Sequence, residues 1–162
     1  MTADAKIEAK FWKALRSDMT VFLGCDGAAP RPMTAQLAGD EDHGPLWFFT
    51  STDTDLGRVL STATKQGTMT FSSKGNDVWA SANGRLSLST DPDMIEKLWN
   101  PFVAAWYEDG KTDPKLRLVR FDAGEAELWE DGSSLVAGFK ALIGSDPKQD
   151  FQDKTAHVRL DT

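Results

Sequence analysis

Three consecutive hydroxyl side chains in the first third of the chain could take part in ligand binding. Thr50, Ser51 and Thr52 directly follow the apolar run 46–49 (LWFF). At the end of a strand, free amides and hydroxyls can hold the polar edge or the phosphate of a ligand. The same residues could instead end the strand and begin a turn. The sequence therefore predicts either a binding edge or a turn at 50–52.

The other side chains that could do chemistry form no recognisable pattern. Cys25 is the only cysteine, which excludes an intrachain disulfide and a zinc site built on cysteine pairs. It follows an apolar run and has no evident cationic neighbour, which favours a packed residue over a reactive thiol. His43 and His157 belong to no metal or triad pattern, and the acidic segment 40–44 is typical of a solvated hairpin tip. We therefore predict no metal site and name no catalytic residue.

Glycines and tryptophans give no site by themselves. The segment 75–86 (GNDVWASANGRL) lacks the G-x-G-x-x-G spacing of a dinucleotide-binding turn. Four tryptophans have the spacing of core or subunit contacts: Trp12, Trp47, Trp99 and Trp106.

Composition excludes some classes of partner. A net charge of -7 and a pI near 4.8 disfavour nucleic acid, which is bound through several lysines and arginines. No apolar stretch approaches the roughly 20 residues that cross a bilayer, and the N-terminus lacks the layout of a secretory signal. We expect a soluble, cytoplasmic protein that binds neither nucleic acid nor membrane.

The elements that must position these residues are mostly short strands. Residues 1–17 form an N-terminal helix with Ile7, Phe11 and Leu15 on one side. Strands are predicted at 19–25, 31–39, 45–51, 68–73 and 77–90, and a hairpin at 116–122 and 124–131. Further helices are predicted at 54–65, from 91 to a break at Pro101, and at 133–144, before a polar, loosely held tail at 145–162.

This order of elements predicts one domain over residues 1–162, mainly β with peripheral helices. Five to seven strands with helices inserted between them fit a small antiparallel barrel better than a parallel sheet. In a barrel, one face of a strand lines the interior and the other can lie under a helix or a partner subunit, so both faces of 46–49 can be apolar.

Five segments resemble the flavin-binding split barrels related to pyridoxamine 5'-phosphate oxidase, in particular their general stress protein branch. They are RPMTA (31–35), GPLWFFTS (44–51), WASANGRLSL (79–88), LWNPFVAAWYEDGKTDPKLRLVRF (98–121) and AELWED (126–131). The signal lies in their order and spacing, because each segment is short and mostly apolar.

The resemblance implies a six-stranded antiparallel split β-barrel that forms a homodimer, with FMN or FAD in two clefts between the subunits. A flavin ring needs apolar walls and a few placed amides and hydroxyls along its edge. The cofactor-binding residues implied are Arg31, Pro32, Met33, Thr34, Phe49, Thr50, Ser51, Trp79, Ser81 and Trp129. Of these, Trp129 resembles the aromatic residue that reaches the cofactor from the second subunit.

The sequence departs from the oxidases at their phosphate and substrate contacts. The oxidases carry a Ser-Arg-Lys clamp for the FMN phosphate where this chain has TDTDL at 52–56, and a lysine where it has Gln36. Residues 156–162 (AHVRLDT) resemble only weakly the arginine and histidine residues with which the oxidases bind their substrate. The resemblance therefore does not imply oxidation of pyridoxamine phosphate.

Two functions remain open from the sequence. The first is a flavin-binding general stress protein whose redox chemistry would occur at the flavin, with a nicotinamide or another reductant as hydride donor. The second is a non-enzymatic, dimeric stress or interaction protein that has lost strong flavin binding, which the acidic TDTDL segment favours.

Overall fold

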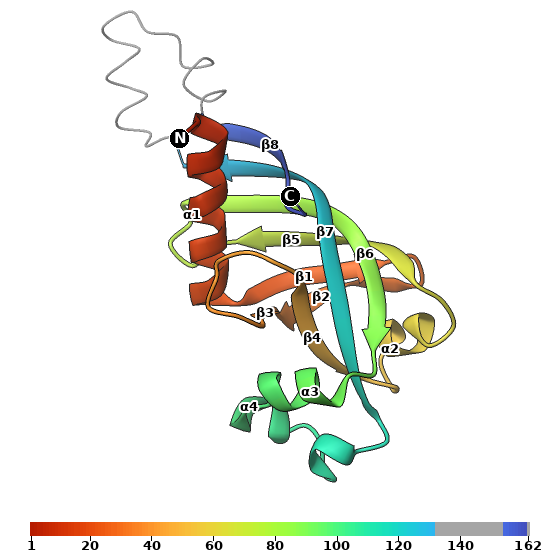
Figure 1. Cartoon of the computed structure of the whole chain (residues 1–162). Coiled ribbons are helices and arrows are strands. Elements are labelled where there is room, and N and C mark those ends of the chain that lie inside the picture. The colour runs from red at the N-terminus through yellow and green to blue at the C-terminus, as the bar shows by residue number, and fades with distance from the viewer. Residues whose placement is uncertain (132–153, 162) are drawn as a thin grey trace, which may run out of the picture.

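The structure, a computed structural model, describes residues 1–131 and 154–161. Its elements in chain order are α1 (Ala3–Asp18), β1 (Thr20–Cys25), β2 (Ala28–Thr34), β3 (Gln36–Leu37), β4 (Leu46–Ser51), α2 (Asp55–Leu60), β5 (Lys65–Ser72), β6 (Val78–Ser89), α3 (Pro92–Leu98), α4 (Pro101–Ala104), the 3-10 turn η1 (Gly110–Thr112), β7 (Leu116–Glu130) and β8 (Thr155–Arg159). Figure 1 shows α1 beside one end of the sheet and α3 and α4 at the other.

The strands form one antiparallel sheet that curls back on itself. Their order is β2-β1-β5-β6-β7-β4-β3, and β8 pairs with β7. β2 and β3 lie at the two ends of this order, yet only Ala35 separates them in the chain. The backbone therefore joins the two ends of the sheet, and the buried Ala35 donates its N–H to the Met19 carbonyl at 2.7 Å.

The sheet is split along one side. β3 pairs with β4 through Gln36 and Leu37, but in the described ladder no residue of β2 pairs with β4. β2 and β4 therefore diverge beyond Ala35. This confirms the split barrel, with eight strands in place of six because the short β3 and the C-terminal β8 add to the sheet.

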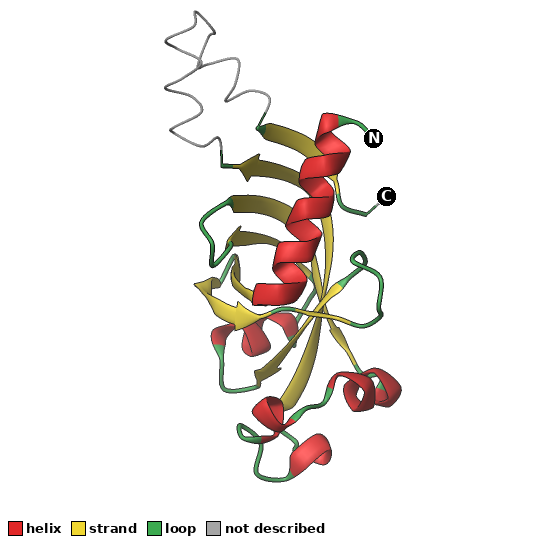
Figure 2. Cartoon of the chain, turned by 90° about the vertical axis from the view of Figure 1, so that its left-hand side faces the viewer, coloured by secondary structure: helices red, strands yellow, loops and turns green. Residues whose placement is uncertain are grey.

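The main core lies between α1 and the inner face of the sheet (Figure 2). In β5, Met69 and Phe71 are buried while their neighbours are exposed, as expected of a strand with one covered face. α1 covers this face with Ile7, Phe11 and Leu15, whose spacing of four residues gives one apolar stripe. Full burial of each such side chain stabilises the fold by about 2 kcal/mol. In the described part, no helix is long and apolar enough to span a membrane.

β4 is apolar on both faces because both are covered. Phe48 belongs to the main core, whereas Trp47 packs on the other side against Leu98 of α3 and Leu118 of β7. This second, smaller cluster also includes Phe49. The sequence-based explanation of the LWFF run is thereby confirmed.

The predicted hairpin at 116–131 is wrong. β7 is one continuous strand of 15 residues, paired with β4 and β6 through its first half and with β6 and β8 through its second. The irregularity that the sequence presents as a turn is a register shift between Ala82 and Gly84 of β6. A Cβ at Gly84 would lie 2.3 Å from the Asp122 carbonyl oxygen, so this close approach of two backbones requires glycine.

Three other boundaries differ from the prediction. The helix predicted at 54–65 ends at Leu60, and β5 already begins at Lys65. Pro101 ends one helix as predicted but also begins α4, where its fixed φ suits the first turn. Residues 155–159 of the predicted tail form β8, while the helix predicted at 133–144 lies outside the described residues.

Candidate functional site

The candidate site begins at the split between β2 and β4. Arg31, Pro32 and Thr34 are exposed on β2, and Met33 is half-buried against the main core. The Arg31 side chain makes no hydrogen bond or ion pair with any described residue, although its backbone pairs with Leu23 of β1. It is thus a cation whose charge is not neutralised within the described chain.

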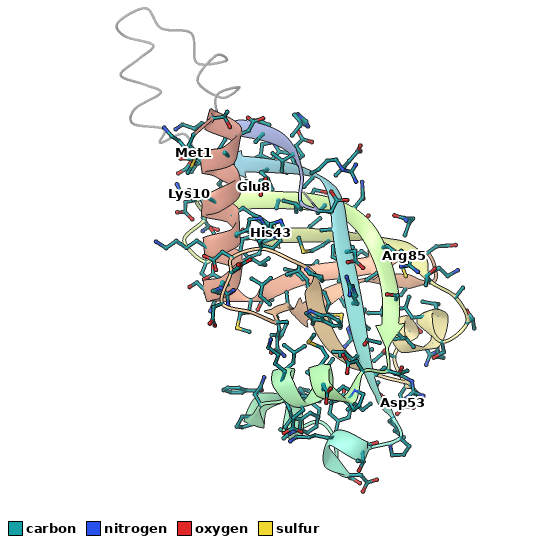
Figure 3. All side chains as sticks on the ribbon, viewed as in Figure 1. Met1, Glu8, Lys10, His43, Asp53 and Arg85 are labelled. Carbon is teal, nitrogen blue, oxygen red and sulfur yellow. The ribbon has the colours of Figure 1, made fainter. Side chains whose placement is uncertain are left out.

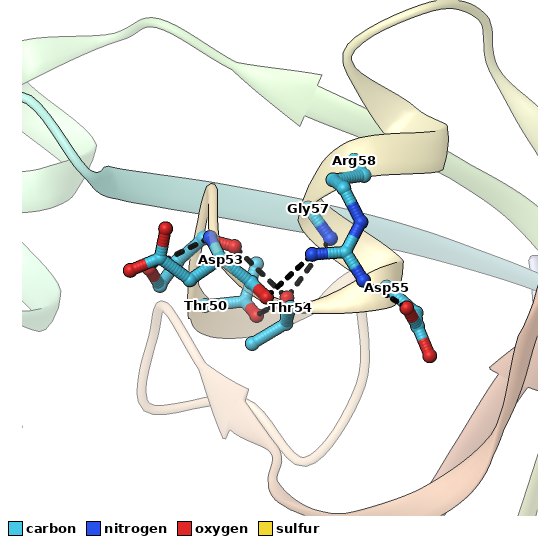
Figure 4. Close-up of polar contacts among 7 residues, drawn as sticks. Thr50, Asp53, Thr54, Asp55, Gly57 and Arg58 are labelled. Carbon is cyan, nitrogen blue, oxygen red and sulfur yellow. Dashed lines mark hydrogen bonds and ion pairs between the residues drawn. The ribbon is translucent and has the colours of Figure 1, made fainter.

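The hydroxyl residues at the end of β4 are engaged in a turn (Figure 4). The Thr54 hydroxyl donates to the Ser51 carbonyl at 2.9 Å and lies 2.8 Å from the Thr50 hydroxyl, which is therefore the donor in that contact. The Ser51 hydroxyl accepts from the Asp53 amide at 3.1 Å. Thr54 also caps α2 by accepting from the Gly57 amide at 3.0 Å.

α2 packs very closely on the end of β4. A Cβ at Gly57 would lie 2.0 Å from the Ser51 carbonyl oxygen, so only glycine fits at this position. Of the two interpretations of residues 50–52, a turn and a binding edge, the turn therefore accounts for their contacts within the chain.

The charges around this turn neutralise one another. Arg58 donates to the Asp53 carbonyl at 2.7 Å and pairs with the Asp55 carboxylate. Lys115 pairs with Asp53 at 3.0 Å, and this hydrogen bond raises the pKa of the lysine. Arg58 and Lys115 are therefore both paired with carboxylates of the turn.

Tyr107 fixes the segment that contains α3 and α4 to the end of β4. Its buried hydroxyl donates to the Thr50 carbonyl at 2.7 Å, and burial raises the pKa of this hydroxyl to about 12. Trp99 lies between Tyr107 and Phe49, with ring centroids 6.2 and 5.9 Å away. Phe49 therefore packs beneath Trp99, on the face of β4 opposite the main core.

Trp79, Ser81 and Trp129 lie together on the outer face of the sheet. Trp79 pairs directly with Trp129 across β6 and β7, and Ser81 pairs with Glu127. One row across this face contains, from β2 to β8, Pro32, Phe22, Thr70, Ser81, Glu127 and His157. Ser81, Glu127 and His157 also line a concavity of about 490 Å³.

Within one chain, Trp129 is far from the end of β4. Thr50 pairs with Arg117, and Trp129 lies twelve residues farther along β7. At about 3.3 Å per residue, this is about 40 Å along the strand. Glu130, next to Trp129, pairs with Lys10 at 3.2 Å, and Figure 3 shows Lys10 and Asp53 at opposite ends of the molecule.

A model of the family described as "Pyridoxamine 5'-phosphate oxidase like" matches residues 6–151. The chain belongs to this family. A solved structure of a protein named for the general stress family, from Xanthomonas campestris pv. campestris, is 52% identical, with a TM-score of 0.74, and covers 83% of this chain and 93% of its own.

Two further relatives of this pyridoxamine 5'-phosphate oxidase-like protein are informative. The general stress FMN/FAD binding protein from Xanthomonas citri is 53% identical, with a TM-score of 0.73, over 80% of this chain and 92% of its own. Protein bli-3 of Neurospora crassa is 31% identical over 93 residues, which are 52% of this chain. The chain spans only 44% of the length of this curated relative.

The fold brings together some of the predicted cofactor residues of this oxidase-like chain. Residues 31–34 and 49–51 lie on the two strands that border the split, whereas Trp79, Ser81 and Trp129 form a second group on the outer face. Their contact with a flavin stays a prediction. Cys25 is half-buried, and burial raises the pKa of its thiol, which fits a packed residue.

Sequence reasoning missed Tyr107, and of its two alternatives for Trp106, a core contact or a subunit contact, the structure excludes the core. Tyr107 is the only tyrosine in the chain, a rarity that could have drawn attention to it, but its partner lies 57 residues away. Trp12 and Trp47 are buried as expected, whereas Trp106 is 84% exposed and belongs to no core cluster of the described residues.

Proposed function

We propose that this chain binds a flavin, FMN or FAD, in the split between β2 and β4, and acts as a homodimeric general stress protein with flavin-dependent redox activity. The observation that carries the proposal is the Arg31 side chain, exposed and unpaired among the described residues, at the split beside the half-buried Met33 on the same face of β2. Its 53% identity to a general stress FMN/FAD binding protein supports it.

The residues at the split fit a flavin ring. Met33 offers apolar surface, and the exposed strand β2 offers main-chain groups along its free edge. Arg31 is placed to neutralise the charge of the flavin phosphate or of the ring edge. When bound, a flavin supplies hydride and electron transfer, and a nicotinamide reductant is the proposed donor.

The dimer explains how Trp129 could share a site with Arg31. Arg31 is aligned across the sheet with Leu23, Met69, Ala82 and Ala126, so Trp129 of the same chain lies four strands and three residues away, about 20 Å, too far for both to hold one flavin ring. A second copy that packs against the outer face would place its Trp129 at the split of the first. The exposed Phe22 and the neutral row from Pro32 to Ser81 suit such a contact.

The first experiment measures visible flavin absorption and flavin fluorescence quenching on purified protein with added FMN or FAD. Arg31→Ala should weaken flavin binding at least about tenfold, because the phosphate would lose a charge-assisted contact. Arg85→Ala is the matched control, since Arg85 is also exposed and is also without a partner among the described residues. Equal affinity of the Arg31 variant and the wild type would refute the assignment.

A mixing experiment tests the shared site. Arg31→Ala and Trp129→Ala proteins, each weak in flavin binding, are combined under conditions that exchange subunits. If each site uses Arg31 of one chain and Trp129 of the other, half of the sites in a mixed dimer are intact and flavin binding returns in part. Absence of any recovery, with subunit exchange shown by mass spectrometry, contradicts the shared site.

The turn at 50–58 favours the second candidate, a stress or interaction protein without strong flavin binding. Its hydroxyls bond within the turn, and Arg58 and Lys115 pair with Asp55 and Asp53. A wild-type protein that neither carries flavin nor quenches added FMN or FAD would exclude the first function and leave this second one.

A further inference from the structure

Two large aromatic side chains on and just after α4 are almost fully exposed. Phe102 and Trp106 each expose 84% of their surface. They are one helical turn apart, and the backbone bonds from Ala104 to Asn100 and from Ala105 to Pro101 keep this stretch helical. At Trp106 and Tyr107 the backbone bonds run to Val103 and Ala104, three residues back, so the two exposed rings belong to one short helical turn. Such a pair in water is costly and marks a binding surface.

The aromatic pair is held in a defined position. The Asn100 side chain accepts hydrogen bonds from the amides of Phe102 and Val103 at 3.0 and 3.1 Å, which fixes the start of α4. Immediately after Trp106, Tyr107 anchors the segment to Thr50. The two rings are thus presented by an anchored element, which lowers the entropic cost of binding a ligand.

The same anchor places α4 beside the candidate flavin site. Thr50 ends β4 at the split, and Trp99, just before α4, contacts Phe49. A molecule on the Phe102 and Trp106 rings would therefore be a neighbour of a flavin bound at the split.

The charge of this segment selects among aromatic ligands. Residues 91–114 contain six carboxylates and two lysines. Lys111 is paired with Glu96 at 2.7 Å, and the exposed Glu108 and Asp109 follow Tyr107, two and three residues after Trp106. This local negative charge repels anions such as phosphates and carboxylates.

We infer that the Phe102 and Trp106 face binds a planar aromatic molecule without negative charge, stacked on one or both rings. Aromatic faces provide the stacking surface, and the carboxylates beside them admit neutral or cationic rings. The inference rests on the proposed function only where it makes this molecule a neighbour of the flavin; binding itself does not require flavin.

The test uses two planar probes of nearly equal shape, quinoline-3-carboxamide and quinoline-3-carboxylate, with the full-length protein and calorimetry or ligand-observed NMR. The neutral amide should bind at least about tenfold more tightly than the anion. Combined Phe102→Ala and Trp106→Ala should weaken binding of the amide at least about tenfold. Combined Phe102→Leu and Trp106→Leu should weaken it nearly as much, because leucine keeps apolar surface but has no ring to stack.

Charge is tested separately. Glu108→Gln with Asp109→Asn should improve binding of the carboxylate and leave the amide unchanged, whereas Asp40→Asn with Glu41→Gln, between β3 and β4 and outside the segment 91–114, should change neither. Equal affinity for the two probes, or unchanged amide binding in the double alanine variant, overturns the inference.

Sedimentation of the same variants distinguishes a protein interface. If the double alanine variant dissociates a wild-type dimer, this face is a contact between copies of the chain and the inference is wrong. Flavin content, measured by visible absorption, is followed independently. A flavin-free wild type that still binds the amide would contradict the proposed function and leave the aromatic surface supported.

Discussion

Tyr107 joins the segment 91–113 to the strand end that sequence reasoning marked as a binding edge. The buried Tyr107 hydroxyl donates one hydrogen bond to the carbonyl of Thr50, which lies 57 residues earlier in the chain. This bond fixes the position of α4 relative to Thr50. A buried tyrosine hydroxyl needs such a partner, and the Thr50 carbonyl provides it.

Tyr107→Phe should remove a pH-dependent part of the stability. Burial raises the folded-state pKa of Tyr107 from 10.0 to about 12. Below pH 10 the contribution of the Tyr107 hydroxyl to stability is fully present. Between pH 10 and pH 12 the tyrosine of the unfolded chain loses its proton while that of the folded chain keeps it, so the free energy of unfolding falls as pH rises. The fall should be about 2 kcal/mol. Urea unfolding at about pH 9 and about pH 11.5 measures it, and an equal fall in Tyr107→Phe would contradict the assignment.

At the residue scale, the sequence predicted the end of a strand better than the way in which its polar groups are used. The apolar run and the hydroxyls after it correctly indicated the end of a strand. The sequence could not decide between a turn and a ligand edge, because the choice depends on contacts of Thr54, Gly57 and Tyr107 that only the folded chain brings together.

At the scale of elements, apolar alternation located most strands, and their boundaries failed where pairing overrides local signals. Asp122 and Gly124 look like a turn, but β7 continues through them because β6 and β8 pair with it. The register shift beside Gly84 accommodates the extra residue of β7. The hydrogen bonds of β7 to two neighbouring strands stabilise the extended backbone more than the local sequence favours a turn.

Gly84→Ala should therefore destabilise the sheet by about 3 kcal/mol. Its Cβ would meet the Asp122 carbonyl oxygen at 2.3 Å and the Ala123 Cα at 2.8 Å, and neither backbone atom can move without shifting β7. Gly75→Ala, whose nearest neighbour is the flexible Asp77 side chain at 3.4 Å, is the control and should change stability by less than about 0.5 kcal/mol. Urea midpoints compare them. A Gly84 variant as stable as the control would show that β7 adapts.

At the scale of the molecule, the two ends of the chain pack against each other. α1 covers the inner face of β8, and Ala156 and Leu160 belong to the same core as Phe11. The fold class was predictable from short alternating strands, whereas the place of β8 was not, because a short polar segment gives no local sign of the distant strand with which it pairs.

Ala156→Asp tests whether β8 is part of the core. The side chain is 1% exposed, so an unpaired carboxylate there should destabilise the protein by at least about 3 kcal/mol. His157→Asn, on the opposite, exposed face of the same strand, should cost less than about 0.5 kcal/mol. Thermal unfolding distinguishes them. Similar melting temperatures for the two variants would mean that the main core does not need β8.

The free edge of β2 has a consequence for how copies of the chain can associate. Pro30 and Pro32 lie at alternate positions of this strand, so both lack an N–H on the same side, and a sheet tolerates this only where that side faces away from a neighbour. If a strand of another chain aligned with this edge, two of its carbonyl groups would find no N–H donor on β2. The opening of the barrel can therefore stay accessible to small molecules without recruiting further chains into fibrous aggregates.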